Sequence, residues 1–154
     1  MRYQLAMESP IGTLTLVEED GALIRLEFGT YRGEAVSCKT PLLACAVKEL
    51  NEYFDGKRIS FTIPLRPEGT PFQKRCWDAL CRIPYGETRT YAQQAAMIGN
   101  PKACRAVGMG NHRNPLPIFI PCHRVVGKNG TLTGYAGGLH IKETLLNIER
   151  MTQS

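Results

Sequence analysis

A proline-rich segment near the middle of the chain divides the sequence into two halves with different patterns. Residues 63–71 contain three prolines and one glycine. Proline interrupts both helices and sheets, so we expect this segment to be a linker. At 154 residues the chain is long enough for one domain or for two small ones. We therefore predict an N-terminal domain over residues 1–66 and a C-terminal domain over residues 70–154.

The first half has the pattern of a few short strands followed by one helix. Apolar side chains recur at helical spacing over residues 42–54. This order predicts a small α+β unit with a supporting role and no evident chemistry. The predicted strands cover residues 3–7, 12–17 and 22–28, with turns at residues 10–12 and 19–21.

Helix signals follow closely after the linker. Thr70 and Thr90 each precede a glutamine by three residues, which is the pattern of a capping box. Gly99 can end the second of these helices, and the next is expected from Asn100-Pro101 to about Asn111. Two helices around a glycine-containing turn predict a helix-turn-helix.

The segment after the helix-turn-helix has the pattern of a β-ribbon and a last helix. Residues 125–132 contain Asn129-Gly130, which predicts a hairpin turn. Residues 141–150 are amphipathic at helical spacing. Together these signals predict a winged-helix-like C-terminal domain, and an α+β class for the whole chain.

The two halves carry opposite net charge. Residues 1–69 have eight Lys/Arg against ten Asp/Glu, a net charge of −2, whereas residues 70–154 have eleven against four, a net charge of +7. A basic half joined to a mildly acidic half favours a polyanion-binding surface on the C-terminal part.

The six cysteines favour a reduced, cytoplasmic protein. They form no Cys-x-x-Cys pair, and no histidine spacing completes a metal site, so we predict no metal, although a site built from scattered residues stays open. The sequence begins without a basic-then-apolar leader and has no apolar run of membrane-spanning length. We therefore expect no membrane partner.

Residues 118–126 contain the candidate nucleophile. Cys122 follows an apolar run and precedes His123 and Arg124. The thiolate is the reactive form of cysteine, and an electropositive setting would raise its fraction. The alternative is a buried structural cysteine beside two solvated neighbours, because cysteine is among the most buried residue types.

The string Pro-Cys-His-Arg-Val at residues 121–125 is similar to a known family signature. With Asn114-Pro115 before it and residues 135–138 after it, the string closely resembles the active-site signature of the O6-alkylguanine-DNA alkyltransferases, also called methylated-DNA–protein-cysteine methyltransferases. The resemblance covers about residues 70–149. It implies a ribonuclease-H-like N-terminal domain and irreversible, stoichiometric transfer of a methyl group from O6-alkylguanine in DNA to Cys122, without a cofactor. Reaction with O4-alkylthymine stays open.

The resemblance also implies the roles of the residues around the nucleophile. A water would join Cys122 to His123, which Glu143 would orient, in the general manner of an activated nucleophile. Tyr91 would lie near the leaving oxygen, and Asn114 would support the tight turn of the site. The guanine pocket would be formed by Val125, Tyr135, Ala136, Gly137 and Gly138. Read without the resemblance, Glu143 is an ordinary solvated charge near a helix start.

The second helix of the predicted helix-turn-helix suits inspection of DNA more than reading of its sequence. Most side chains in residues 102–110 are small and cannot discriminate bases. The resemblance implies that this helix enters the minor groove of double-stranded DNA, that Arg105 fills the gap left by a flipped base, and that Tyr91 helps to rotate the flanking phosphate. Lys102, Ala106 and Gly108 would lie against the DNA. Otherwise Arg105 is a surface charge and Tyr91 a packing residue.

We expect the protein to be a monomer.

Two other functions compete with alkyl transfer. Cysteine, histidine and glutamate could form a hydrolase triad, but that function leaves the glycine-rich helix and the charge division unexplained. A helix-turn-helix regulator would explain the basic half, but it leaves residues 121–125 without a purpose.

Overall fold

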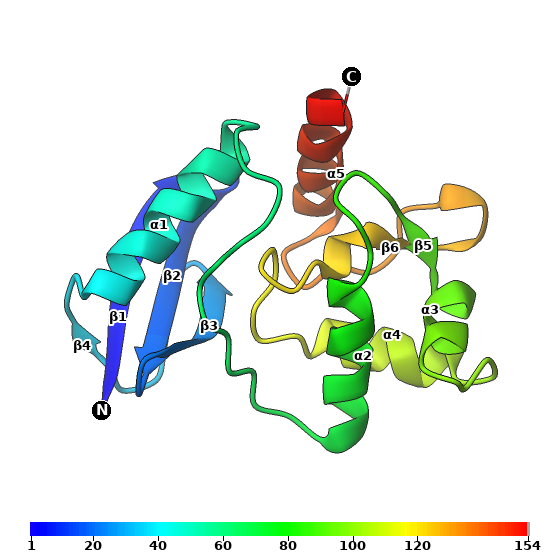
Figure 1. Cartoon of the computed structure of the whole chain (residues 1–154), viewed down its shortest axis with the longest axis horizontal. Helices are drawn as coiled ribbons and strands as arrows, with labels where there is room; N and C mark the ends of the chain where they lie inside the picture. Colours follow the sequence, from blue (N-terminus) through cyan, green and yellow to red (C-terminus); the bar gives the residue numbers. More distant parts are fainter. Residues whose placement is uncertain (154) are drawn as a thin grey trace. The chain divides into compact units, whose positions relative to one another are not determined.

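The computed structural model describes residues 1–153, and the chain divides between Glu68 and Gly69 into two compact units (Figure 1). The first part of the proline-rich segment belongs to the N-terminal unit. The amide of Leu23 donates to the Pro64 carbonyl at 2.8 Å, and the amide of Arg66 donates to the Leu23 carbonyl at 2.9 Å. These bonds fix residues 64–66 beside a strand, so the connection between the units begins after them.

Within residues 1–68, four strands form one sheet with a helix packed on it (Figure 1). The sheet has the order β3-β2-β1-β4; its first three strands are antiparallel neighbours, and β4 pairs in parallel with β1. The elements are β1 (Arg2–Ser9), β2 (Gly12–Glu19), β3 (Ala22–Phe28), β4 (Val36–Ser37) and α1 (Pro41–Phe54). The three predicted strands and the predicted helix are therefore confirmed, with small changes at their ends.

Local sequence explains how this unit folds. Asp20 and Gly21 have φ angles of 50° and 79°, the left-handed conformations that a two-residue hairpin turn requires. Thr40 caps α1 by accepting a hydrogen bond from the Leu43 amide. Leu43 and Leu50 of α1 are fully buried. The unit thus has its own apolar core.

The C-terminal unit is mainly helical. Its elements are α2 (Pro71–Cys81), β5 (Arg89–Thr90), α3 (Tyr91–Met97), α4 (Cys104–His112), the short 3₁₀ helix η1 (Cys122–Arg124), β6 (Val125–Val126), a second 3₁₀ turn η2 (Lys128–Gly130) and α5 (Leu139–Gln153). Both predicted capping boxes are confirmed: the side chains of Thr70 and Thr90 accept from the amides of Gln73 and Gln93, whose side chains bond back.

Helix α4 begins later than predicted. Gly99 has the expected positive φ of 76° after α3, but Pro101 and Lys102 form a turn, and the helix starts at Cys104 without a side-chain cap. Ala103 at the N-cap has no side-chain acceptor, so nothing local marks this helix start. The connection within the helix-turn-helix is consequently longer than the sequence suggested.

The predicted hairpin over residues 125–132 is wrong. Asn129 and Gly130 do adopt the positive φ angles of a tight turn, 62° and 77°, and the Gly127 amide donates to the Thr131 carbonyl at 2.7 Å. The ribbon stops there, because β6 pairs in parallel with β5, which lies far away in the sequence. This pairing ties the segment after Cys122 to the start of α3.

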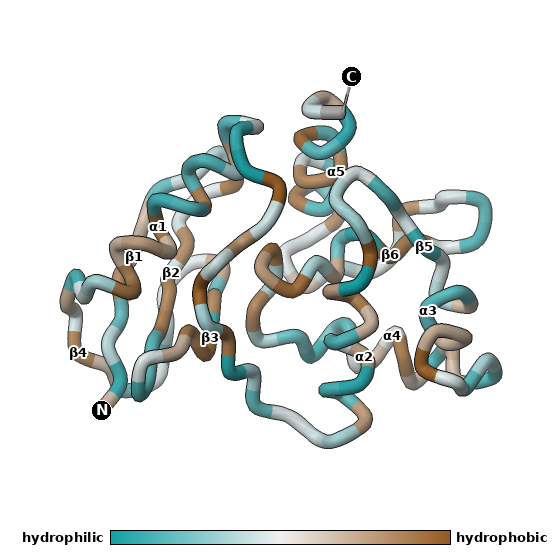
Figure 2. Tube along the Cα trace, viewed as in Figure 1, coloured by the Kyte–Doolittle hydropathy of each residue, from teal (hydrophilic) through white to brown (hydrophobic). Residues whose placement is uncertain are grey.

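A buried amide pair and an apolar core hold the helices of this unit together. Gln94 of α3 and Asn111 of α4 exchange two hydrogen bonds of 2.9 and 2.7 Å, and Gln94 also donates to the Cys76 carbonyl of α2. Along α5 the hydropathy alternates between apolar and polar residues (Figure 2), and the apolar Leu145 is completely buried. Such an alternation is what an amphipathic helix needs in order to cover a core.

Candidate active site

The backbone before Cys122 is held in an unusual path by one side chain. Asn114 donates from Nδ2 to the Ile120 carbonyl at 2.8 Å and accepts at Oδ1 from the Leu116 amide at 2.9 Å. Between them, Ile118 takes a φ of 77°, which is costly for a β-branched residue. Burial of the apolar run offsets that cost. Asn114 therefore supports the tight turn that leads into Cys122.

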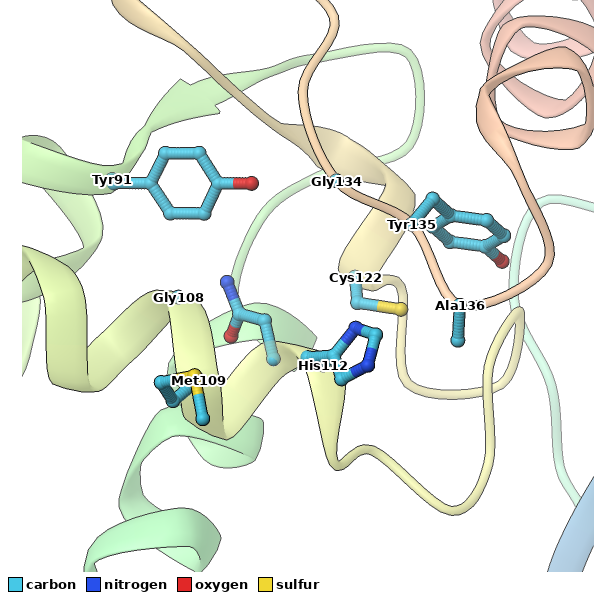
Figure 3. A pocket seen from close by; sticks show the side chains of 9 residues that line it. Tyr91, Gly108, Met109, His112, Cys122, Gly134, Tyr135 and Ala136 are labelled. Carbon is cyan, nitrogen blue, oxygen red and sulfur yellow. The ribbon is translucent and has the colours of Figure 1, made fainter.

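Cys122 opens η1 and faces a pocket with a volume of about 340 Å³ (Figure 3). One wall is part of α4, and the opposite side is formed by Tyr91 at the start of α3 and by the loop before α5. The lining residues are Tyr91, Gly108, Met109, Asn111, His112, Cys122, Gly134, Tyr135 and Ala136.

The structure brings together five of the residues that the sequence predicted for the site. Tyr91, Gly108, Cys122, Tyr135 and Ala136 all line the pocket. The predicted pocket residues Val125, Gly137 and Gly138 are not among its lining residues, since Val125 is fully buried in β6. His112, which was not among the predicted site residues, also lines the pocket (Figure 3).

The environment of the thiol is opposite to the one predicted. Burial raises the pKa of Cys122 to about 11, and a hydrogen bond with Asn114 and the charge of Lys142 lower it only in part. His123 and Arg124 do not supply the expected positive field, because their hydrogen bonds go to a carboxylate. At neutral pH the resting residue is thus a thiol, and its reaction requires a base.

A candidate for that base lies in the same short helix. His123 is fully buried, and its Nε2 lies 2.6 Å from Oε2 of Glu149 on α5. Burial lowers the pKa of His123, which keeps the imidazole neutral near pH 7. A neutral imidazole that donates Nε2–H to a carboxylate has its lone pair on Nδ1. The arrangement is that of a general base oriented by a third group.

The orienting carboxylate is Glu149, and the prediction of Glu143 is wrong. Glu143 lies on the exposed face of α5, whereas Glu149 is 1% exposed. Lys142, Leu145 and Glu149 recur at intervals of three and four residues and are all buried. Because residues at that spacing share one helix face, the apolar pattern of α5 could have identified Glu149.

Glu149 is held by more than His123. The guanidinium of Arg124 donates to both carboxylate oxygens, at 2.9 and 3.2 Å, and the Gly86 amide donates to Oε1 at 3.0 Å. Burial alone would raise the pKa of Glu149, but the bonds from His123 and Arg124 outweigh it and lower the pKa to about 2. The carboxylate is therefore ionised over the physiological range.

Lys142 is a site residue that sequence reasoning missed. Its side chain is buried, and Nζ donates to the Thr133 carbonyl at 2.7 Å, with the Gly134 carbonyl at 3.5 Å. Burial lowers the pKa of Lys142, and the nearby Cys122 opposes that shift. The ammonium thus fixes the loop that lines the pocket and acts electrostatically on the nucleophile.

The residues predicted for DNA binding lie along or just before α4, except Tyr91, which is the first residue of α3. Arg105 and Ala106 are exposed on the helix, and Lys102 is exposed in the turn that precedes it. Gly108 faces Tyr91: a methyl group in place of its hydrogen would lie 3.7 Å from the tyrosine ring. That distance is an ordinary van der Waals contact, so the ring lies directly beside the helix at this position.

Three further properties of the described chain concern metal ions, membrane helices and disulfides. Within residues 1–153, no group of three or more His, Cys, Asp or Glu side chains is placed to hold a metal ion. The helices of the same residues include none that is long and apolar enough to cross a membrane. All six cysteines are free thiols.

Two family models match this chain over almost its whole length. Residues 1–67 match the model described as "6-O-methylguanine DNA methyltransferase, ribonuclease-like domain", and residues 71–151 match "6-O-methylguanine DNA methyltransferase, DNA binding domain". These matches confirm the resemblance seen in the sequence. They also confirm the α+β class, with a ribonuclease-like first unit.

Individual relatives agree with the family models. The constitutive methylated-DNA–protein-cysteine methyltransferase of Bacillus subtilis is 50% identical over 161 aligned residues, which cover 99% of this chain and 98% of the relative. A Methanosarcina barkeri protein of the same name is 51% identical and covers 96% of both chains. Among solved structures, the Mycobacterium tuberculosis O6-methylguanine methyltransferase has a TM-score of 0.92 at 43% identity, covering 99% of this chain and 94% of the other. A structure of the M. tuberculosis OGT in complex with DNA has a TM-score of 0.91 at 44% identity, covering 97% of this chain and 94% of the other.

Proposed function

Because the chain belongs to the 6-O-methylguanine DNA methyltransferase family, we propose that it repairs DNA by transferring the alkyl group of O6-alkylguanine to its own Cys122. The observation that supports Cys122 as the acceptor is its position in the pocket wall, next to His123, whose imidazole is hydrogen-bonded to Glu149. The product is a thioether on the protein and an intact guanine in DNA.

The transfer is a nucleophilic displacement at the alkyl carbon, and the proton of the Cys122 thiol ends on the guanine that leaves. His123 takes the proton of Cys122 at Nδ1 through a water, and Glu149 stabilises the imidazolium that forms. The sulfur attacks the alkyl carbon as the bond from that carbon to O6 breaks. Tyr91 donates a hydrogen bond to O6, where negative charge develops. A thioether is a stable bond that the base and the carboxylate of this site do not cleave, so each molecule reacts once.

DNA is bound through α4. We assign Arg105 to the space left by the flipped base and Lys102, Ala106 and Gly108 to the minor groove, an assignment supported by their positions on or before this helix. Extruding a base costs a few kcal/mol, which an inserted guanidinium can offset by stacking. The M. tuberculosis relative solved with DNA also supports a DNA partner.

The flipped guanine enters the pocket beside Cys122. Tyr135, Ala136 and the backbone toward Gly138 would recognise its edge, whereas Val125 is buried in β6 and does not line the pocket. We assign the protein to the cytoplasm, a reducing compartment that suits its six free thiols, and expect it to react as a monomer.

The decisive experiment measures the mass of the protein after incubation with duplex DNA that contains O6-methylguanine. We expect one methyl group per molecule, located on Cys122 by peptide mapping, and none in Cys122→Ser, which should still bind DNA. Methylation of Cys76, Cys81 or Cys104 instead would overturn the assignment of the nucleophile. Turnover of an ester or peptide would indicate a cysteine hydrolase, and DNA binding without any mass gain would indicate a regulator.

A further inference from the structure

The phenol of Tyr91 is hydrogen-bonded to a side chain of the loop before α5. The hydroxyl of Thr133 donates to the phenol oxygen of Tyr91 at 3.1 Å. Figure 3 shows the Tyr91 hydroxyl pointing toward the chain segment of Gly134, next to Thr133 in sequence. The bond thus joins the loop before α5 to the first residue of α3, across the pocket.

The direction of the Thr133 hydroxyl is set by packing on its other side. A methyl group added to Gly127 would lie 3.1 Å from the side-chain methyl carbon of Thr133, so that methyl already occupies the space beside the glycine. The Thr133 carbonyl is held by the buried ammonium of Lys142 at 2.7 Å. With the methyl group against Gly127 and the backbone fixed by Lys142, the hydroxyl is left to face Tyr91.

The hydrogen bond from Thr133 determines whether Tyr91 acts as a donor or as an acceptor toward a substrate. A phenol has one proton to donate, and its oxygen also accepts hydrogen bonds. Because Thr133 occupies the accepting role, the proton of Tyr91 is available for an acceptor in the pocket. A donor that itself accepts a hydrogen bond is polarised and becomes a stronger donor.

We propose that Thr133 is a positioning residue for alkyl transfer, which directs the phenolic proton of Tyr91 toward O6 of the departing guanine. The inference rests on the proposed function and deepens it. Thr133 touches no substrate atom; it acts through Tyr91. As the bond from O6 to the alkyl carbon breaks, charge grows on O6, and the oriented phenol stabilises that charge.

The test compares Thr133→Val with Thr133→Ser. Valine keeps the methyl group against Gly127 and replaces the hydroxyl with a second methyl, whereas serine keeps the hydroxyl. The rate of transfer is measured with free O6-benzylguanine and with duplex DNA containing O6-methylguanine. We expect Thr133→Val to slow both reactions by a similar factor, roughly 3–10-fold as for loss of one neutral hydrogen bond, and Thr133→Ser to restore most of the rate.

A double-mutant cycle separates positioning from a merely structural role. In a Tyr91→Phe background there is no phenolic proton to direct, so Thr133→Val should have no further effect on the rate. Equal slowing by Thr133→Val with and without the Tyr91→Phe substitution would overturn the inference, as would a wild-type rate for Thr133→Val. If Thr133→Val does not fold, Thr133→Ala and Thr133→Ser form a second pair that differs only in the hydroxyl.

The reaction of the wild-type protein distinguishes failure of the proposed function from failure of the role proposed for Thr133. Absence of any benzyl or methyl gain on the wild type would contradict the proposed function itself. A wild type that reacts normally, together with a Thr133→Val variant that reacts equally well, would contradict only the role of Thr133.

Discussion

Glu149 accepts hydrogen bonds from His123, from Arg124 and from the Gly86 amide, whereas Glu143 is exposed on the other face of α5. A single carboxylate therefore orients the imidazole of His123, the proposed base, and pairs with the buried guanidinium of Arg124. Removing one partner of such a buried network leaves the others uncompensated, which is strongly destabilising.

We predict that Glu149→Gln slows transfer at least tenfold and destabilises the protein by roughly 3–5 kcal/mol, since it removes the charge that Arg124 and protonated His123 need. Single-turnover kinetics and urea unfolding measure the two effects. Glu143→Gln is the matched control and should resemble the wild type in both. If Glu143→Gln were the slower variant, the assignment of Glu149 as the orienting residue would have to be abandoned.

The second prediction at the residue scale concerns the buried ammonium of Lys142. Lys142→Met keeps most of the buried stem but removes the cation that lowers the pKa of Cys122 and the donor that holds the Thr133 carbonyl. We expect Cys122 to become less reactive, with transfer slowed roughly 3–10-fold. The measurement is the pH dependence of iodoacetamide labelling of the Cys122 peptide, whose midpoint should rise. Lys128→Met, at an exposed position, should leave that midpoint unchanged.

At the scale of elements, the proposed function gives α4 two tasks, DNA contact and the lining of the pocket. Arg105 is exposed near its start, while Gly108 and His112 line the pocket further along. These positions are three and four residues apart and so share a helix face. In the proposed function, contact with DNA and access to Cys122 would therefore be linked through a single segment, which the buried Gln94–Asn111 pair fixes to α3.

We predict that Arg105→Ala lowers affinity for duplex DNA and the rate of repair in the duplex, but leaves the reaction with free O6-benzylguanine unchanged, because a free base needs no extrusion. Arg82→Ala removes the same charge from an exposed position at the end of α2 and serves as the control. The rates are compared at one salt concentration, since phosphate contacts are sensitive to salt. Equal slowing on the free base and the duplex would rule out the insertion role.

At the scale of the whole molecule, the buried ion pairs make stability depend on pH. The pKa of Glu149 is lowered from 4.5 to about 2, so its stabilising contribution is complete above pH 4.5 and is lost as the pH falls toward 2. The lowered pKa of His123 acts in the same direction, because the unfolded chain takes up that proton first as the pH falls below 6.5.

We therefore expect the C-terminal unit to lose about 3 kcal/mol of stability from Glu149 alone between neutral pH and pH 2. Urea unfolding followed by the fluorescence of Trp77, which lies in this unit, measures the change. Glu149→Gln should have a flatter pH profile, and its stability should approach that of the wild type in acid. Parallel profiles for the two proteins would show that Glu149 is not the titrating group.

Alkylation of Cys122 should also lower the stability of the protein. The thioether loses the hydrogen bonds that the sulfur makes with Asn114 and Tyr135, and the added group must fit beside the residues that line the pocket. We expect the methylated protein to melt several degrees lower, at roughly 4–8 °C per kcal/mol for a domain of this size. The shift should grow from methyl to benzyl. Identical melting of free and methylated protein would show that the pocket accommodates the group without loss.

Features encoded by neighbouring residues could be predicted from the sequence. The capping boxes at Thr70 and Thr90, the turn glycine Gly99 and the string around Cys122 each depend on a few consecutive side chains, whose preferences act before any tertiary contact forms. The family resemblance belongs to the same kind of signal, because it is carried by residues 121–125 and their near neighbours.

Other features were decided only when distant segments met. The parallel pairing of β5 with β6 replaced a hairpin that Asn129-Gly130 favoured, because strand pairing depends on which segments the fold brings together. The phase of α5 placed Glu149 on His123 and left Glu143 exposed. The pKa of Cys122 rose because burial outweighs the neighbouring charges, and burial is a property of the packed chain that a list of adjacent residues does not contain.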